Sequence, residues 1–300
     1  MASSYFWVKI RGLFQDNLLN MPNHLLYIIM DSCRFDSYQA AKTPNIDSIG
    51  TVECRYSYAS WTSPSHYTML MGMIPHTSPQ NVFASEVYKQ EFVKWVDRLG
   101  IPNLSFKTFV PELSLAKVCK NLGYRTVARV SMPVLNQFTN LNKYFDDYSL
   151  MPNHNDFASM VEEIDFDGDS PYFYFLNLGE THYPYMLSEE NLPRISGVHG
   201  VFKKMDQFIE DSNEPIEEEA EEEQSFFSKQ EMQRLHTQQI SCVEYIDGLL
   251  GKLLEKCPEN THIIVTADHG ELFGEDNYFG HGPIMHKKCF EIPFVEGIKP

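Results

Sequence analysis

An acid and a histidine follow an apolar run near the C-terminus of this chain. Residues 263–266 (Ile-Ile-Val-Thr) are strand-forming, Asp268 and His269 come shortly after them, and His281 lies eleven positions after Gly270. A carboxylate and an imidazole at the end of a strand suit Zn²⁺ or Mn²⁺ better than the all-oxygen shell that Ca²⁺ prefers. A plain strand-end turn is the alternative interpretation of so short a motif.

A second strand edge carries matching chemistry at the other end of the chain. Residues 25–30 (Leu-Leu-Tyr-Ile-Ile-Met) form a continuous apolar run, as expected of a strand buried on both faces of a parallel sheet, and the run ends in Asp31. Sites in open α/β sheets form outside the carboxyl ends of the strands, so we expect Asp31 to meet Asp268 and His269. The alternative role for Asp31 is a helix N-cap.

A hydroxyl group lies in the third segment that could do chemistry. Pro64 fits the first turn of a helix, with Ser63 or Thr62 as its cap. Thr62 would then lie near a helix N-terminus, where backbone N–H groups favour an anion. Its hydroxyl is either a nucleophile whose pKa a metal lowers or a simple cap.

The order of four motifs resembles the alkaline phosphatase/sulfatase superfamily. The similarity is to its sulfatase-like branch, which includes arylsulfatases, phosphonate monoester hydrolases, and phosphoethanolamine and phosphoglycerol transferases. It extends over about residues 24 to 296, with weaker matches at 115–126 and 171–185. The four motifs are DSCRFD at 31–36, TPNID at 43–47, TSPSH at 62–66 and TADHG at 266–270.

The departures from the sulfatase pattern favour phosphorus over sulfur. Sulfatases oxidise a Cys or Ser to formylglycine and place an arginine four residues later, whereas this chain has Thr62 and His66. Threonine cannot give formylglycine. Ser32 and His269 replace an acid and an amide of the sulfatase calcium site, as in the threonine-using transferases and phosphodiesterases.

The resemblance implies a metal-dependent hydrolase or transferase that acts on phosphate esters. Thr62 would attack phosphorus, and water or an acceptor hydroxyl would release the phospho-threonine intermediate. One or two divalent ions, Zn²⁺ or Mn²⁺, would be held by five residues: Asp31, Thr62, Asp268, His269 and His281.

Further residues are assigned to the substrate by the same resemblance. His182 and His281 would contact the substrate phosphate or help to form a second metal site, and Glu180 is a possible partner in that second site. His66 would contact phosphate or lie at the surface. For His182 and His281, a buried and hydrogen-bonded structural role is the alternative.

The remaining sequence predicts one α/β domain over residues 1–300. The chain is 43% hydrophobic, which is enough for one substantial core, and its apolar runs alternate with helical segments. This pattern predicts an alkaline phosphatase-like fold, a mostly parallel central sheet with helices on both faces. Strands are expected near six segments: 25–30, 52–58, 125–130, 172–178, 261–267 and 292–295.

Charge and hydropathy exclude several partners. The net charge is −17, without Lys/Arg clusters, so nucleic acid is not expected as a partner. Nine acids between 210 and 223 predict a solvated, mobile insertion at about 209–225. No membrane span is expected, and the apolar patch at the N-terminus is too short for a signal peptide, so the chain is predicted to be cytoplasmic.

The C-terminus and the substrate leave alternatives open. Relatives in this branch continue past the strand near 292–295, so the C-terminal subdomain is expected to be missing or minimal, or an oligomer or a partner chain completes the site. The natural substrate is a small phosphoester or a related molecule that the sequence does not name. A sulfuryl or phosphonate ester hydrolase is the second interpretation, and an inactive binding or scaffold protein is the third.

Overall fold

A computed structural model describes residues 24–77, 110–187, 228–259 and 261–300. Their central feature is a seven-stranded sheet with the order β2-β9-β6-β1-β5-β3-β4. β6, β1, β5, β3 and β4 run parallel, whereas β9 is antiparallel to β6 and β2 is antiparallel to β9. The predicted mostly parallel α/β sheet is therefore confirmed. The strands are β1 (Leu25–Met30), β2 (Glu53–Tyr56), β3 (Arg125–Val130), β4 (Asp147–Leu150), β5 (Tyr172–Leu178), β6 (His262–Ala267) and β9 (Glu291–Ile298), and a separate hairpin is formed by β7 (Leu272–Phe273) and β8 (Phe279–Gly280).

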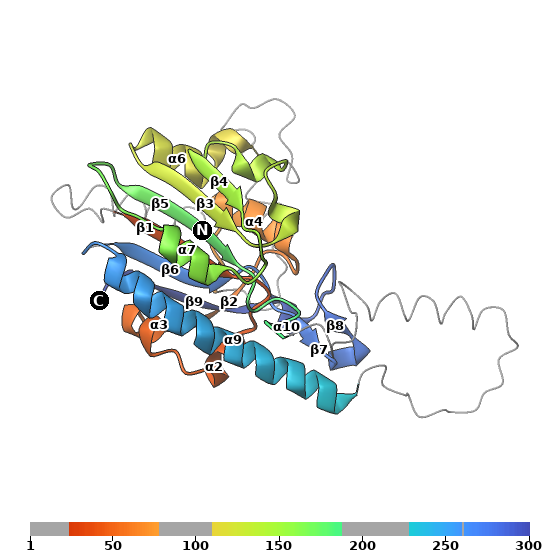
Figure 1. The fold of residues 1–300 in the computed structure, drawn as a ribbon. Helices are drawn as coiled ribbons and strands as arrows, with labels where there is room; N and C mark the ends of the chain where they lie inside the picture. Colours follow the sequence, from red (N-terminus) through yellow and green to blue (C-terminus); the bar gives the residue numbers. More distant parts are fainter. Residues whose placement is uncertain (1–23, 78–109, 188–227, 260) are drawn as a thin grey trace, which may run out of the picture.

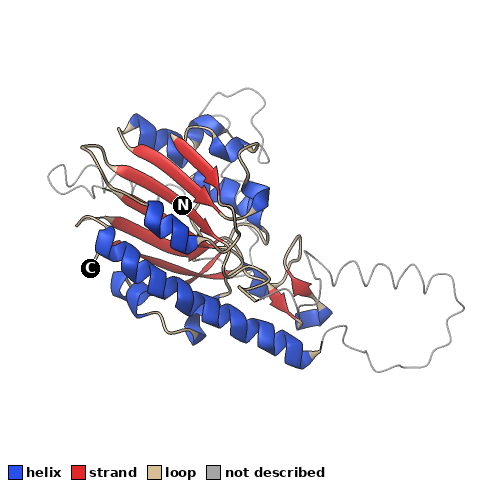
Figure 2. Ribbon diagram, in the orientation of Figure 1, coloured by secondary structure: helices blue, strands red, loops and turns tan. Residues whose placement is uncertain are grey.

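Helices cover both faces of the sheet (Figures 1 and 2). Alternation along β1 divides the core, because Leu26 and Ile28 pack on one face and Tyr27 and Ile29 on the other. The first face is covered by α2 (Phe35–Ala40), α3 (Pro44–Ile49), α7 (Phe157–Glu163) and the long α9 (Lys229–Lys256). The second face is covered by α4 (Thr62–Leu70) and α6 (Leu115–Asn121). The short elements are α10 (Lys287–Phe290) and the 3-10 turns Pro111–Leu113, Pro133–Leu135, Asn140–Asn142 and Glu275–Asn277.

The expected cap of α4 is wrong. The helix begins at Thr62 itself, and Trp61, with extended backbone angles, occupies the N-cap position without a side-chain hydrogen bond. Two residues before this start, Ser60 Oγ donates to the Gly282 carbonyl oxygen at 2.5 Å and Gly282 N donates back to the Ser60 carbonyl oxygen at 3.2 Å. Because the Thr62 hydroxyl does not cap the helix, it is left for other partners.

The sequence did not predict β4, α7 or the antiparallel direction of β9. The predicted insertion between about 75 and 110 lies largely outside the described residues, as does the acidic segment at 209–225. Within the described ranges, no helix combines the length and the hydrophobicity that a membrane span requires.

Candidate active site

Two aspartates meet where β1 and β6 end. These strands are paired in parallel with Met30 opposite Ala267, so the next residues along, Asp31 and Asp268, come side by side. Both carboxylates are fully buried. The backbone N–H of Ser32 donates to Asp268 Oδ1 at 3.0 Å. This hydrogen bond holds the carboxylate that follows β6 against the backbone that follows β1.

The Thr62 hydroxyl faces this pair. Thr62 is 4% exposed, and its Oγ1 lies 3.3 Å from His269 Nε2 and 3.5 Å from Asp31 Oδ1. The Gly270 carbonyl oxygen is 2.8 Å from His269 Nδ1, which assigns the ring proton to Nδ1 and leaves the Nε2 lone pair facing the hydroxyl. Burial, and next the neighbouring imidazole of His281, hold the pKa of His269 well below its usual range, so the ring is neutral.

His66 is fully buried, so the predicted surface position of this residue is wrong. Its Nδ1 donates to the Thr62 carbonyl oxygen at 2.9 Å, and its Nε2 accepts from Asn177 Nδ2 at 3.2 Å. The same amide nitrogen donates to Asp31 Oδ2 at 2.9 Å. Asn177 was not predicted from the sequence, although a single polar residue in the apolar strand β5 was an available signal.

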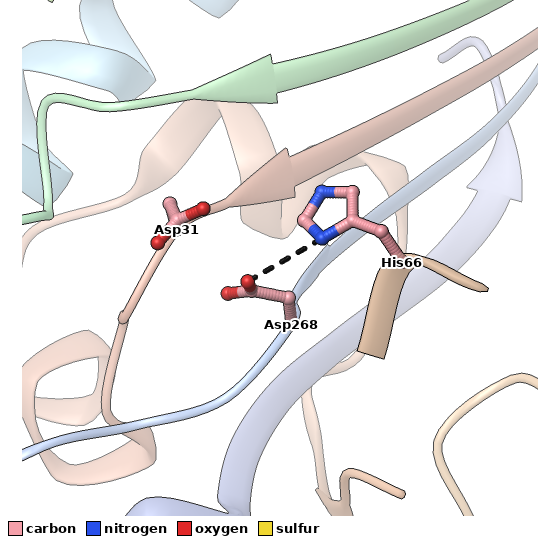
Figure 3. A group of neighbouring side chains, drawn as sticks. All are labelled: Asp31, His66 and Asp268. Carbon is pink, nitrogen blue, oxygen red and sulfur yellow. Dashed lines mark ion pairs between the residues drawn. The ribbon is translucent and has the colours of Figure 1, made fainter. Parts of the chain in front are cut away.

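Asp31, His66 and Asp268 form a possible metal site. They are the one group of three or more potential ligands found among the described residues, and their ligand atoms lie within 4.8 Å of one another. Figure 3 shows the three side chains converging, with His66 Nδ1 3.5 Å from Asp268 Oδ2. Thr62 Oγ1 and His269 Nε2 border the same group, since His269 Nε2 is 3.3 Å from Asp268 Oδ2.

The electrostatics of the two carboxylates fit a divalent cation. Burial, and next the charge of Asp31, raise the pKa of Asp268 well above its usual range, and Asp268 Oδ2 accepts no hydrogen bond from the described residues. Burial opposes ionisation of Asp31 as well, but its neighbouring histidines, His182 first, and the Asn177 hydrogen bond bring its pKa below the usual value. Two buried acids with a bare oxygen are stabilised by a cation, and the mixed oxygen and nitrogen donors suit Zn²⁺ or Mn²⁺.

Two further histidines from loops reach the site. The His281 ring lies 4.3 Å from the His269 ring and 5.1 Å from the His182 ring, measured between centroids. The Ser32 hydroxyl and Glu271 Oε2 are 3.3 and 3.5 Å from His281 Nδ1. The structure therefore brings His182 and His281 together with the aspartates and Thr62.

Glu180 has a different neighbourhood. Its Oε1 accepts from the backbone N–H of Phe157 at 2.8 Å, at the beginning of α7, and its Oε2 has no hydrogen-bond partner among the described residues. Burial raises the pKa of this carboxyl to about 7. Its hydrogen bond leads to α7 rather than to the Asp31–Asp268 group, and its part in substrate binding stays a prediction.

Gln239 joins three loops and was also missed from the sequence. Its Nε2 lies 3.0 Å from the Ser32 carbonyl oxygen, the Thr181 carbonyl oxygen and Glu271 Oε1. Its position four residues after Leu235, within the apolar stripe of α9, could have indicated that the side chain is buried.

A family model described as Sulfatase matches residues 23–295. No curated protein sequence matches the chain.

Several solved structures have a similar fold. The zinc complex of the C-terminal periplasmic domain of EptC from Escherichia coli is 14% identical, with a TM-score of 0.52, over 93% of this chain and 73% of that one. The corresponding domain of the phosphoethanolamine transferase EptC from Campylobacter jejuni is 14% identical, with a TM-score of 0.53, over 91% and 78%. A 2-O GAG sulfatase is 12% identical, with a TM-score of 0.55, and this chain spans 64% of its length and aligns over 92% of its own.

The likeness to these structures concerns the fold, whereas the family follows from the match over residues 23–295. The chain belongs to the sulfatase family.

Proposed function

We propose that the chain is a metal-dependent hydrolase or transferase of phosphate esters with Thr62 as its nucleophile. One observation carries the proposal: the buried Thr62 hydroxyl lies within 3.5 Å of both Asp31 Oδ1 and His269 Nε2, beside the possible metal site. A threonine that only capped its helix would have its hydroxyl on backbone N–H groups, and α4 has no side-chain cap.

The residues of the site divide the chemistry between them. Thr62 Oγ1 bonds to phosphorus while the bond from phosphorus to the leaving oxygen breaks and that oxygen takes up a proton. Asp31 Oδ1 and His269 Nε2 are the acceptors within reach of the hydroxyl proton. Water or an acceptor hydroxyl then attacks phosphorus, and Thr62 Oγ1 leaves and regains its proton.

A divalent metal bound among Asp31, Asp268 and the neighbouring imidazoles would supply Lewis acidity, lowering the pKa of the hydroxyl and offsetting phosphoryl charge. His66 helps to hold the nucleophile in place through its hydrogen bond to the Thr62 carbonyl oxygen. The solved EptC domain in complex with Zn supports zinc as the first ion to test.

Sulfuryl ester hydrolysis is the second candidate, and the family match favours it. Against it, a threonine side chain cannot be converted to formylglycine, and the imidazole of His269 replaces the amide oxygen expected of a calcium site. The identity of the active metal therefore separates the two candidates.

The test compares Thr62→Ala with Thr68→Ala, a threonine of the same helix whose hydroxyl donates to the Ser65 carbonyl oxygen at 2.7 Å. Each protein is stripped with a chelator, loaded with Zn²⁺, Mn²⁺ or Ca²⁺, and given aryl phosphate monoesters, aryl phosphate diesters and an aryl sulfate. We expect phosphoester turnover with Zn²⁺ or Mn²⁺, lost by on the order of 10³-fold or more in Thr62→Ala and kept in Thr68→Ala.

Three outcomes would count against the proposal. Activity that survives Thr62→Ala contradicts the phospho-threonine mechanism. Aryl sulfate turnover with Ca²⁺ alone favours the sulfuryl candidate. Absence of turnover in a wild-type protein that binds metal, with every ester, favours an inactive binding protein.

A further inference from the structure

The Nδ1 atom of His281 faces two hydrogen-bond acceptors. Ser32 Oγ lies 3.3 Å away, and Glu271 Oε2 lies 3.5 Å away. The single hydroxyl hydrogen of Ser32 is used on Asp31 Oδ1 at 3.1 Å, so Ser32 Oγ offers only lone pairs to the ring. The Glu271 carboxylate oxygen is also an acceptor. In a neutral His281 ring the proton therefore lies on Nδ1, and Nε2 is the nitrogen left for a ligand.

The backbone at Ser32 is shaped for this contact. Its φ of 62° lies in the left-handed region, which non-glycine residues rarely adopt and which is concentrated at functional sites. In that conformation its N–H reaches Asp268 Oδ1, and its hydroxyl lies between Asp31 and His281.

Glu271 is held firmly in place. It is 1% exposed, and its Oε1 accepts from the Tyr185 hydroxyl at 2.6 Å and from Gln239 Nε2 at 3.0 Å. Because two donors occupy Oε1, the other carboxylate oxygen is the one turned toward His281.

We propose that Glu271 is a positioning residue that fixes the orientation and the tautomer of His281. A neutral Nε2 can accept a proton or bind a cation, but it cannot donate to a phosphate oxygen. The sequence left two roles open for His281, contact with the substrate phosphate or part of a second metal site, and this tautomer favours the second. The catalytic consequence rests on the proposed function, whereas the tautomer does not.

The first test is ¹⁵N NMR of the histidine rings in the full chain, with and without Zn²⁺, with His281→Gln used to assign the signal. We expect an Nδ1–H tautomer for His281. In Glu271→Gln the Tyr185 and Gln239 donors keep the amide oxygen, so the –NH₂ group turns toward Nδ1 and the tautomer reverses. His269 serves as an internal control, because its Nδ1 is held by a backbone carbonyl. An Nε2–H tautomer in the wild type, or an unchanged one in Glu271→Gln, would overturn the proposal.

The second test is a double-mutant cycle on phosphoester turnover. Glu271→Gln should lower kcat/KM by roughly 10–100-fold, and adding it to His281→Gln should cost little more than His281→Gln alone. Glu275→Gln is the matched control, since that carboxylate pairs with Arg34 instead. Additive losses would indicate a structural role unrelated to His281.

The two tests also separate this proposal from the proposed function. A protein without turnover still reports the His281 tautomer by NMR. Thermal unfolding shows whether Glu271→Gln is folded. If it is not, the proposal is tested by the His281 tautomer in the wild type and in Tyr185→Phe, which removes one of the two donors to Glu271 Oε1.

Discussion

The two halves of the site are built differently. The strand-end half consists of Asp31, Thr62, Asp268 and His269, all at most 4% exposed and placed by adjoining strand ends and the first residue of a helix. The loop half consists of His182, Glu271 and His281 and lies on segments outside the central sheet. The strand ends and the start of α4 place the first half directly. The second half is held by hydrogen bonds from residues elsewhere in the chain, chiefly those of Gln239.

The difference assigns each half a task. Register leaves little freedom, which suits atoms that must bind a metal and hold a nucleophile within a narrow geometry. Loops tolerate change, so they are where substrates are distinguished. We therefore expect loss of a carboxylate in the strand-end half to abolish metal binding and turnover together, and changes in the loop half to reduce turnover with a smaller effect on metal affinity.

The largest effect is expected from Asp268→Asn in the strand-end half. Losing a ligand charge should weaken Zn²⁺ binding by on the order of 100-fold or more and remove turnover. In the metal-free protein the same change should raise the free energy of unfolding, because the neutral amide removes the cost of burying this carboxylate and, next, its repulsion by Asp31, which together raise the pKa of Asp268. Metal content and chelator-treated thermal unfolding measure the two effects.

The exposed Asp276→Asn is the control for this variant, and it should change neither quantity. A metal-free Asp268→Asn protein that is less stable than the wild type would show that the carboxylate is held by protein contacts alone.

Gln239→Met tests the hydrogen bonds that hold the loop half in place. Methionine fits the apolar stripe of α9 but removes the Gln239 Nε2 donor from two carbonyl oxygens and from Glu271 Oε1, which keeps the Tyr185 hydroxyl, so we expect a loss of about 3 kcal/mol in unfolding free energy. Zn²⁺ affinity should fall much less than in Asp268→Asn. Denaturant unfolding and metal titration measure the two quantities.

Gln238→Met is the matched neighbour for that variant, since Gln238 makes one hydrogen bond to the residues that the structure describes, to the Tyr185 carbonyl oxygen. Equal losses in the two variants would mean that Gln239 has no special part in holding the loops.

The same contrast explains what the sequence could predict. Asp31, Asp268 and His269 could be placed together because apolar strands end in them and parallel strands share an edge. Asn177 and Gln239 could not, because one polar residue in an apolar element indicates burial without naming its partner. Their partners lie far along the chain, with Gln239 207 residues from Ser32.

Glu180 shows the limit of inference from proximity in sequence. It lies two residues before His182, which suggested a shared site, yet its carboxylate reaches α7, a short helix that the sequence pattern did not predict. The location of a carboxylate depends on its backbone donors, and these become known only with the fold.

Glu180→Gln gives the smallest expected effect, on stability and not on metal binding. The carboxyl has a pKa of about 7 in the folded protein and an ordinary value of 4.5 when unfolded, because burial disfavours its charge. Between these values the folded state binds more protons than the unfolded state, so wild-type stability falls as pH rises from 4.5 to 7. Glutamine keeps the acceptor for the Phe157 N–H and does not titrate. We expect the variant to match the wild type near pH 4.5 and to be more stable at pH 8, by on the order of 2 kcal/mol.

Denaturant unfolding across this pH range measures the effect, with Glu162→Gln, an exposed glutamate on α7, as the control. Parallel pH profiles for the wild type and Glu180→Gln would mean that the carboxyl is solvated or paired in solution. If the variant instead lost Zn²⁺ binding or turnover, Glu180 would belong to the loop half of the site, because a residue that only anchors α7 should affect neither Zn²⁺ binding nor turnover.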